Sequence, residues 1–395
     1  MSAAASERDR VSVWLCITAL CVGGAEQTLV DLANALDTDR YDVTVWTIFE
    51  TGPLKADLKS DVTVRSLTAR GVVENGSVAA ATTPLAYVRA VTAFCYFAAV
   101  ERPDIVHSFL LFDNLLARLA GLCSPATVVT GVRAVPDEPP ATRAALDRLT
   151  IGLSDRIVSN SRAGAQLAVE RGAAPETVSV VHNGRHIPTY RDASADAVRA
   201  ELGIDDSELV VGTVGRLLER KGHFELVAAW AQVEQTHPDA RLVFVGDGQD
   251  RAEIEAHARE LGCADSIDFL GTRRDVPQLL AAMDVFAFPS HFEGLPGAVI
   301  EAMAAGRPIV ATPVDGTAEL LDSYHTGLFV SPDAPDELAW ALTRLLDTPR
   351  LRESLGAAAQ RRAGEDFAID SMVSEFEALY RDIEPAEPKP RAAVS

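Results

Sequence analysis

The sequence predicts an α/β protein of two doubly wound, Rossmann-like domains, each built on a parallel sheet. The chain has 395 residues, which exceeds one ordinary hydrophobic core and suits two. In both halves, apolar runs of strand length alternate with amphipathic segments of helix length. That alternation is typical of parallel strands covered by helices on both faces, so we expect one such sheet in each half.

The first domain is expected at residues 1–185. Its helices are predicted at residues 25–36, 84–100 and 114–122, and its strands at 11–16, 41–48, 103–106, 128–135, 156–160 and 178–182. Leu29, Leu32 and Leu36 fall at helical spacing in the first helix. Pro84 begins the second helix, where a missing backbone N–H costs little.

The second half repeats the pattern. Strands are predicted at residues 209–214, 242–245, 267–270, 285–288 and 309–311, and helices at 222–236, 251–261, 276–282, 298–305, 333–347 and 351–366. The polar stretch 186–208, which contains Pro188, is expected to be an interdomain linker, so the second domain spans 209–368. Residues 369–383 form a further helix, and the proline-containing residues 384–395 are expected to be a disordered tail.

Charge is distributed unevenly along the chain, whose net charge is −21. Residues 1–185 carry 17 basic and 20 acidic side chains, whereas residues 186–395 carry 19 and 37. A strongly acidic protein repels a phosphate backbone, so we expect no nucleic-acid partner. Two explanations for the acidic bias stay open: adaptation to a high-salt cytoplasm, or a GC-rich genome, which also favours Arg over Lys.

Cysteine usage and hydropathy indicate a cytoplasmic protein. The five cysteines are scattered and show no metal-binding spacing, so reduced thiols in apolar surroundings are the simplest interpretation. No run of 18 or more apolar residues is present, and the N-terminus lacks the basic region of a secretory signal. The spaced pair Asp37 and Asp39 lies in a turn after the first helix, so we expect no metal site there.

The most specific segment is residues 284–312, DVFAFPSHFEGLPGAVIEAMAAGRPIVAT. A predicted strand ends here, a turn carrying Glu293, Gly294 and Leu295 follows, and the next helix carries Glu301. Open α/β sheets bind ligands at the carboxyl edge, where a helix N-terminus can also receive an anion. The two carboxylates could therefore face one ligand. If these two glutamates stood alone, a simpler interpretation would be that Glu293 is an acidic residue at a helix start and that Glu301 is a solvated or salt-bridged helix residue.

A second segment, residues 211–222 (VGTVGRLLERKG), places Arg216 and Lys221 just beyond a predicted strand. Two fixed cations in this place can neutralise a diphosphate without a divalent metal. Two exposed cations at a helix start would be an unattractive alternative, since cations disfavour the N-terminal end of a helix dipole.

The first half offers weaker candidates. Gly23 and Gly24 follow the first strand and would let the backbone approach a phosphate at the start of a helix. His107 follows the strand 103–106 and is expected at the sheet edge, where it could bond a ligand; a buried structural histidine is the alternative. Arg133 is a candidate for contact with an acceptor or a phosphate.

Glu293, seven intervening residues and Glu301 resemble the E-x7-E element of retaining GT-B glycosyltransferases, and the surrounding EGLP…EAMA text is similar to the GT4 family. Arg216 and Lys221 are similar to that family's G-R…K-G motif, whose cations grip the diphosphate. The resemblance covers nearly the whole chain. Two positions depart from the family pattern. Phe109 stands where many relatives have a second histidine. Arg185–His186 replaces the end of the usual N-G-(I/V)-D turn, so we interpret this turn as a domain exit and not as a site.

The resemblance implies a GT-B fold, in which two domains face each other across a cleft and residues 369–383 cross back to the first domain. It implies that Glu301 binds the donor ribose and that Glu293 contacts the donor sugar. The backbone of Gly294 and Leu295 would hold the sugar and diphosphate, with Gly23 and Gly24 facing them across the cleft. Arg216, Lys221, Glu293 and His107 are the catalytic candidates.

The resemblance implies that the protein transfers a sugar from a UDP- or GDP-sugar to a hydroxyl with retention of configuration and needs neither a metal ion nor a cofactor. The expected acceptor is a glycan or a lipid-linked molecule, in the assembly of cell-surface polysaccharide or lipid-linked glycan. The near-neutral first half is compatible with peripheral docking at the inner face of the plasma membrane. A phosphorylase or a sugar-nucleotide 2-epimerase uses the same fold, but the EGLP…EAM text argues against both. A non-catalytic sugar-nucleotide binder, or a scaffold partner of another transferase, is the alternative from a different class.

Overall fold

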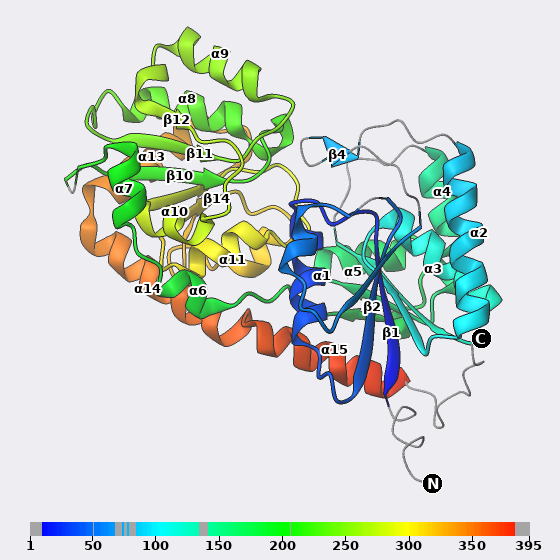
Figure 1. Ribbon diagram of the computed structural model, residues 1–395. Coiled ribbons are helices and arrows are strands. Elements are labelled where there is room, and N and C mark those ends of the chain that lie inside the picture. Colours follow the sequence, from blue (N-terminus) through cyan, green and yellow to red (C-terminus); the bar gives the residue numbers. More distant parts are fainter. Residues whose placement is uncertain are drawn as a thin grey trace. The chain divides into compact units, whose positions relative to one another are not determined.

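The computed structural model describes residues 10–49, 51–67, 73–74, 77–78, 84–133, 141–205 and 207–383. The chain divides into two compact units (Figure 1). Unit 1 comprises Met1–Asn183 together with Ile369–Ser395, and unit 2 comprises Gly184–Ala368. The expected tail, residues 384–395, lies outside the described residues.

Unit 1 contains a seven-stranded sheet of order β3-β2-β1-β6-β7-β8-β9, in which all neighbouring strands are parallel. Its strands are β1 (Val11–Ile17), β2 (Tyr41–Thr47), β3 (Thr63–Ser66), β6 (Ile105–Ser108), β7 (Thr127–Val132), β8 (Arg156–Ser159) and β9 (Val178–Val180). Two short strands, β4 (Val73–Glu74) and β5 (Ser77–Val78), form a separate antiparallel pair.

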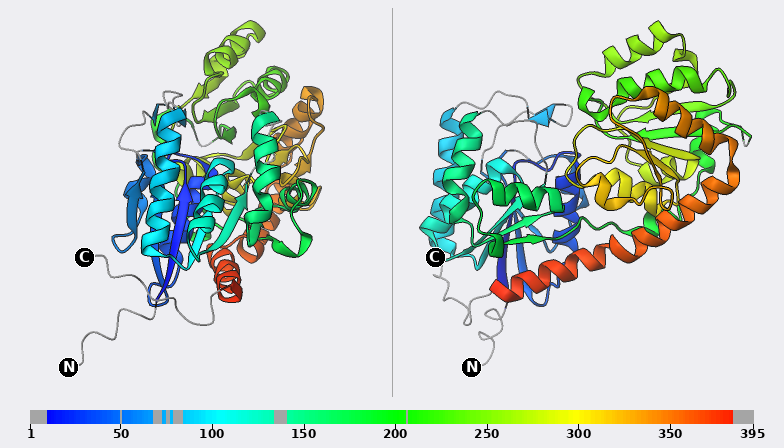
Figure 2. Two further views of the ribbon diagram at one scale, coloured as in Figure 1. Left: turned by 90° about the vertical axis from the view of Figure 1, so that its right-hand side faces the viewer. Right: turned by 180° about the vertical axis from the view of Figure 1, so that it is seen from behind.

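Helices cover both faces of this sheet. They are α1 (Gly24–Ala35), α2 (Pro84–Glu101), α3 (Leu111–Cys123), α4 (Ala141–Thr150), α5 (Arg162–Glu170) and α15 (Ile369–Ile383), with short 3₁₀ turns at Pro53–Asp57, Ile151–Leu153 and Pro175–Thr177. Alternate residues of β1 serve the two faces, as a pleated strand requires. Leu15 packs in the cluster that contains Phe376 of α15, whereas Trp14 packs with Phe94 of α2. Helix α15 lies beside α1 (Figure 2).

Unit 2 contains a six-stranded parallel sheet of order β12-β11-β10-β13-β14-β15. Its strands are β10 (Val210–Val214), β11 (Arg241–Val245), β12 (Ile267–Phe269), β13 (Val285–Phe288), β14 (Ile309–Ala311) and β15 (Leu328–Phe329). The strand order changes direction between β10 and β13. Ligands of open α/β sheets bind at such a switch point, outside the carboxyl ends of the strands.

Two hydrophobic clusters, one on each face, pack helices against the unit 2 sheet (Figure 1). The helices are α6 (Ile187–Arg191), α7 (Asp196–Leu202), α8 (His223–Val233), α9 (Arg251–Leu261), α10 (Val276–Ala282), α11 (Gly297–Ala304), α12 (Thr317–Leu320), α13 (Pro335–Asp347) and α14 (Pro349–Asp366), with 3₁₀ turns at Glu219–Lys221 and Ala264–Ser266. The predicted fold class, a pair of doubly wound parallel-sheet domains, is therefore confirmed.

Residues 186–208 differ from the linker that the sequence suggested. They contain α6 and α7, and both belong to unit 2. Ile187, Val198 and Ile204 are buried in one of the unit 2 clusters. Their burial explains the difference, because a few well-placed apolar side chains anchor an otherwise polar segment to the core.

Within the described residues, no helix combines the length and the apolar composition needed to cross a membrane.

Candidate active site

Apart from Glu301, which lies on α11, the predicted donor-site residues of unit 2 lie between β10 and α8 and between β13 and α11; β10 and β13 are neighbouring strands of its sheet. Gly222 brings the two loops together. Its φ of +70° is one that side-chain-bearing residues rarely adopt, and a Cβ there would lie 1.9 Å from the Pro289 carbonyl oxygen. The His291 amide also donates a hydrogen bond to the Arg220 carbonyl at 2.9 Å. Glycine at position 222 therefore permits the close approach of the two loops.

Lys221 and Glu293 form an ion pair between these loops. The Ser290 hydroxyl donates a second hydrogen bond, of 2.7 Å, to the same Glu293 oxygen, Oε1. The Lys221 ammonium also lies 5.5 Å from the centre of the Phe288 ring. With side chains only 15 % and 10 % exposed, Lys221 and Glu293 form a partly desolvated pair, in which the attraction is stronger than at an open surface.

Arg216 differs from Lys221 in being exposed. Its backbone carbonyl accepts a hydrogen bond of 3.1 Å from His223 Nε2. Burial lowers the pKa of His223 to about 4, so this imidazole is neutral near pH 7 and serves to hold the loop. The Arg216 side chain lies at the surface of the loop after β10.

Gly294 and Leu295 form the turn that precedes α11. The Leu295 side chain is buried in the unit 2 core. A Cβ at Gly316 would lie 1.6 Å from the Gly294 carbonyl oxygen, so a second glycine lets the chain pass directly behind the turn. The position of these backbone groups is therefore set by packing on both sides.

Glu301 lies on α11 and is paired with Arg185, a residue that the sequence did not mark as functional. Arg185 Nε donates a hydrogen bond of 2.8 Å to Glu301 Oε1, and the arginine side chain is only 3 % exposed. A Cβ at Gly297, the first residue of α11, would lie 2.0 Å from Arg185 Nη2. Arg185 lies beside the boundary between the two units, as expected of a domain-exit turn, and its guanidinium also fills the space that Gly297 leaves open and holds the Glu301 carboxylate. The departure from the usual N-G-(I/V)-D turn was the available signal.

The structure also corrects the expectation that His107 lies at the sheet edge. His107 is fully buried, shares a hydrogen bond of 2.7 Å with the Tyr380 hydroxyl through Nδ1, and stacks on Phe109 at 4.6 Å between ring centres. Burial, assisted by the charge of Arg133, lowers the pKa of His107, so the ring is neutral. His107 is thus anchored in unit 1 through Nδ1, whereas its Nε2 has no hydrogen-bond partner among the described residues.

Arg133 is held by contacts within unit 1. Its guanidinium carbon lies 4.4 Å from the centre of the Phe109 ring, and its Nη1 donates a hydrogen bond of 2.8 Å to Asn183 Oδ1. The aromatic ring that replaces the family's second histidine therefore forms the support on which this cation rests.

Gly23 and Gly24 lie at the start of α1. Gly23 has an extended backbone, with a φ of −171°, which any residue can adopt. A Cβ at Gly23 would meet only the movable Glu26 side chain, and one at Gly24 would meet nothing within 4 Å. The fold of the protein itself does not require glycine at either position.

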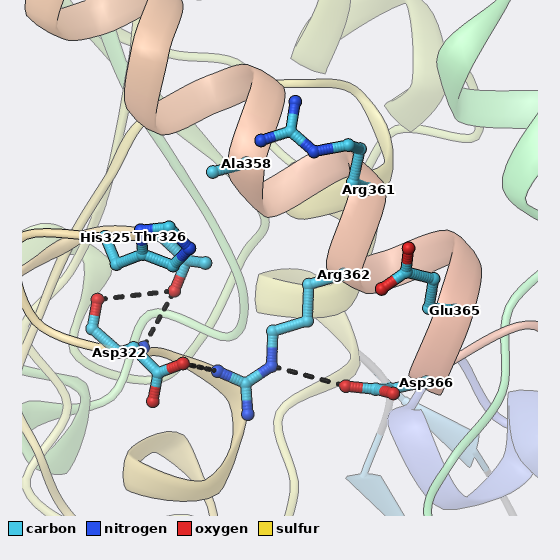
Figure 3. A pocket seen from close by; sticks show the side chains of 8 residues that line it. All are labelled: Asp322, His325, Thr326, Ala358, Arg361, Arg362, Glu365 and Asp366. Carbon is cyan, nitrogen blue, oxygen red and sulfur yellow. Dashed lines mark hydrogen bonds and ion pairs between the residues drawn. The ribbon is translucent and has the colours of Figure 1, made fainter.

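A polar pocket of about 340 Å³ lies elsewhere in unit 2 (Figure 3). Its lining residues are Asp322, His325, Thr326, Ala358, Arg361, Arg362, Glu365 and Asp366, and none is a donor-site candidate. Arg362 is already paired with Asp322 at 2.7 Å and with Asp366 at 3.5 Å. These charges satisfy one another, so the pocket does not extend the candidate active site.

Comparison with known proteins supports the sequence resemblance. Residues 194–362 match the family model described as "Glycosyl transferases group 1", and residues 23–184 match the model described as "Glycosyl transferase 4-like domain". The chain is 33% identical over 238 residues to the D-inositol 3-phosphate glycosyltransferase of Segniliparus rotundus, which covers 58% of this chain and 53% of that protein. It is 30% identical over 239 residues to the alpha-D-kanosaminyltransferase of Streptomyces kanamyceticus, with 58% and 59% covered. The chain thus spans a little over half the length of these curated relatives.

Among solved structures, HepE of Anabaena in complex with UDP and glucose is similar with a TM-score of 0.83 at 23% identity, covering 94% of this chain and 100% of HepE. HepE has also been solved in complex with UDP-glucose. At this level of identity the likeness shows a shared fold.

Proposed function

The chain belongs to the group 1 (GT4) glycosyltransferases, and from this we propose that it transfers a sugar from a nucleotide-diphosphate sugar to a hydroxyl acceptor with retention of configuration. The observation that carries the proposal is the ion pair of Lys221 and Glu293 at the carboxyl ends of β10 and β13, with Glu301 on the helix that follows. The same switch point of the sheet would thus offer a cation to a phosphate and carboxylates to sugar hydroxyls.

For the donor we propose a UDP-sugar, with a GDP-sugar as the alternative. The support is that HepE, which shares this fold, binds UDP and UDP-glucose. Glu301 would accept hydrogen bonds from the ribose hydroxyls while Arg185 fixes its orientation. The amides of Gly294 and Leu295 would hold the sugar and the diphosphate.

In the reaction, Arg216 and Lys221 would stabilise the charge that develops on the departing nucleotide diphosphate. The acceptor oxygen would attack the face of the sugar that the diphosphate leaves, and the phosphate oxygen would take the acceptor proton. Glu293 would bind the sugar hydroxyls. No side-chain nucleophile and no metal ion enter this scheme. His107 stays a proposed catalytic candidate, with a buried side chain whose Nε2 has no hydrogen-bond partner among the described residues.

On the acceptor side, we propose a hydroxyl of a glycan or lipid-linked glycan, bound by unit 1 near Arg133. Gly23 and Gly24 stay proposed donor-binding residues, and the support is that the fold itself requires glycine at neither position, which leaves room for a ligand to approach the backbone. This reaction would take place in the cytoplasm, at or near the inner face of the plasma membrane.

Donor binding can be tested by thermal denaturation with UDP, GDP, ADP and their common sugars, in the presence of EDTA. A ligand that binds only the native state raises the melting temperature, and at a hundredfold excess over Kd it adds about 2.7 kcal/mol of stability. We expect a selective rise with uridine nucleotides. A folded protein that responds to none of them would instead favour the alternative of a non-catalytic relative or scaffold partner.

The role of Glu293 can be tested with Glu293→Ala. We expect loss of transfer while the far-UV circular dichroism spectrum is retained, because this carboxylate lies in a loop. The matched control is Glu260→Ala, which removes a highly exposed glutamate near the end of α9. Turnover that survives Glu293→Ala would exclude the proposed role.

A further inference from the structure

Three side chains of unit 2 converge beside the Glu293 loop without taking part in the proposed chemistry. Glu225 comes from the first turn of α8, His291 from the loop between β13 and α11, and Asp333 from the loop between β15 and α13. One nitrogen or oxygen atom from each lies within 4.8 Å of the other two. His291 Nε2 is 3.6 Å from Glu225 Oε1 and 3.3 Å from Asp333 Oδ1. Three elements separated in sequence thus direct ligand-type atoms at one point.

These atoms are close to one another, yet they are not hydrogen-bonded. Within the described part of the chain, His291 Nε2 and Glu225 Oε2 are buried atoms with no hydrogen-bond partner. A buried polar atom without a partner costs on the order of 1–3 kcal/mol, so the arrangement is incomplete as it stands. A bound group that interacts with both atoms would remove this cost.

The spacing fits a metal ion. Zinc binds imidazole nitrogen and carboxylate oxygen at about 2.0–2.2 Å, and two ligands at a tetrahedral angle around it are then about 3.3–3.5 Å apart. The two distances from His291 Nε2, 3.3 and 3.6 Å, are close to this value. In such a site the cation lies along the lone pair of His291 Nε2, and the two carboxylate oxygens lie to either side of the cation. This placement also explains why the imidazole does not hydrogen-bond to the carboxylates.

We propose that Glu225, His291 and Asp333 form a binding site for one divalent cation of the zinc type, with a water molecule in the open coordination position. One neutral imidazole and two carboxylates are a ligand set that zinc accepts, and the two negative charges balance the charge of the ion. Glu225 and His291 are 22 % and 20 % exposed, whereas Asp333 is 76 % exposed, so the ion would enter from the Asp333 side.

The function of this cation is structural. His291 is two residues from Glu293, and its backbone amide already ties the loop to Arg220. An ion bound to His291 would connect this loop to the start of α8 and to the loop before α13. It would thereby restrict the segment that carries Glu293 without entering the transfer reaction itself.

The test uses the full chain, stripped of metal with EDTA and then dialysed free of the chelator. Zn²⁺ is titrated calorimetrically, and Co²⁺ is added as a spectroscopic probe of coordination. We expect one Zn²⁺ per chain, a Co²⁺ absorption spectrum typical of four-coordination, and a higher melting temperature with Zn²⁺. His291→Ala and Asp333→Asn should each weaken Zn²⁺ binding by at least about a hundredfold, more than the loss of an outer-shell partner usually costs.

The control is His237→Ala. His237 Nε2 lies 3.2 Å from Asp347 Oδ1, but among the described residues His237 belongs to no group of three potential metal ligands. This variant should therefore bind Zn²⁺ as the parent does. Asp333→Asn changes an exposed loop residue and should fold normally. The proposal is overturned if the parent protein binds no Zn²⁺, or if binding is unchanged in both site variants. In either case the three side chains would be a polar cluster that holds no ion.

Discussion

At the scale of single residues, the buried pair of Arg185 and Glu301 is the feature that adds most to the predicted site. A guanidinium cannot lose its proton, so a buried arginine needs a compensating partner. Glu301 supplies that partner through Oε1. If Glu301 binds the donor as proposed, Arg185 acts on the donor through it, as a positioning residue.

Arg185→Leu should weaken donor binding more than it slows turnover. Loss of a hydrogen bond to a charged group costs about 1.5–3 kcal/mol, which corresponds to a roughly ten- to hundredfold higher donor KM. Steady-state kinetics would measure this, with Arg362→Leu as a control that removes an arginine of the separate polar pocket. An unchanged donor KM in Arg185→Leu would refute the positioning role.

Asp113 predicts a pH dependence of stability. Its carboxyl is fully buried on α3 and accepts a hydrogen bond of 2.8 Å from the Thr18 hydroxyl. Burial raises its pKa from 3.8 to about 8. At a pH between these two pKa values, the unfolded chain releases the Asp113 proton and the folded chain keeps it. The free energy of unfolding therefore falls as the pH rises, by at most about 1.4 kcal/mol per pH unit.

Asp113→Asn removes this titration. The variant should therefore gain stability relative to the parent as the pH rises from 4 to 8, and the difference should level off above pH 8. Melting temperatures of both proteins across this range would show it. A difference that does not change with pH would mean that Asp113 is ionised in the folded protein.

At the scale of elements, the site depends on a loop approach that only glycine allows. Gly222 precedes α8 with a φ of +70°, and Gly262 follows α9 with a φ of +77°. A Cβ at Gly222 would collide with the Pro289 carbonyl, whereas one at Gly262 would meet nothing within 4 Å. The two positions share the backbone strain and differ in the steric clash.

Gly262→Ala should cost about 1–2 kcal/mol, the usual penalty for a side chain in the left-handed region. Gly222→Ala should cost clearly more, and it should also weaken donor binding, because it separates the loops that hold Lys221 and Glu293. Urea denaturation and the UDP thermal shift would measure the two effects. Equal losses of stability in the two variants would argue against the loop contact.

At the scale of the whole molecule, the division of the chain is not sequential. Unit 2 is one continuous segment, but unit 1 needs α15 from the far end of the chain. Phe376 and Tyr380 of α15 are fully buried, and Tyr380 bonds the buried His107. Loss of one such aromatic side chain typically costs about 3–5 kcal/mol, a large fraction of the stability of a domain.

A fragment of residues 184–368 should therefore fold alone and melt in a single cooperative transition. A fragment of residues 1–183 should not fold stably, since it lacks α15. Joining residues 369–383 to its end through a flexible linker should restore a cooperative transition in differential scanning calorimetry. If residues 1–183 fold without the helix, the packing of α15 is dispensable for unit 1.

Much of the candidate site could be predicted because it is encoded locally. Arg216 and Lys221 stand a few residues after one apolar strand, and Glu293 stands a few residues after another. Parallel strands bring such residues to one sheet edge, so the Lys221–Glu293 pair follows from topology. The partner of Glu301 could not be predicted in this way. Arg185 is 116 residues away in sequence, and its fit depends on the missing side chain of Gly297.

The sequence by itself determined the alternation of strands and helices, the two parallel sheets and the loops that carry the donor-site residues, because these features depend on the periodicity of neighbouring side chains. Only the tertiary structure decided that residues 186–208 join unit 2, that His107 is buried against Tyr380, and that Arg185 holds Glu301. Each of these outcomes depends on packing between segments far apart in the chain, where burial and a specific partner outweigh any local pattern.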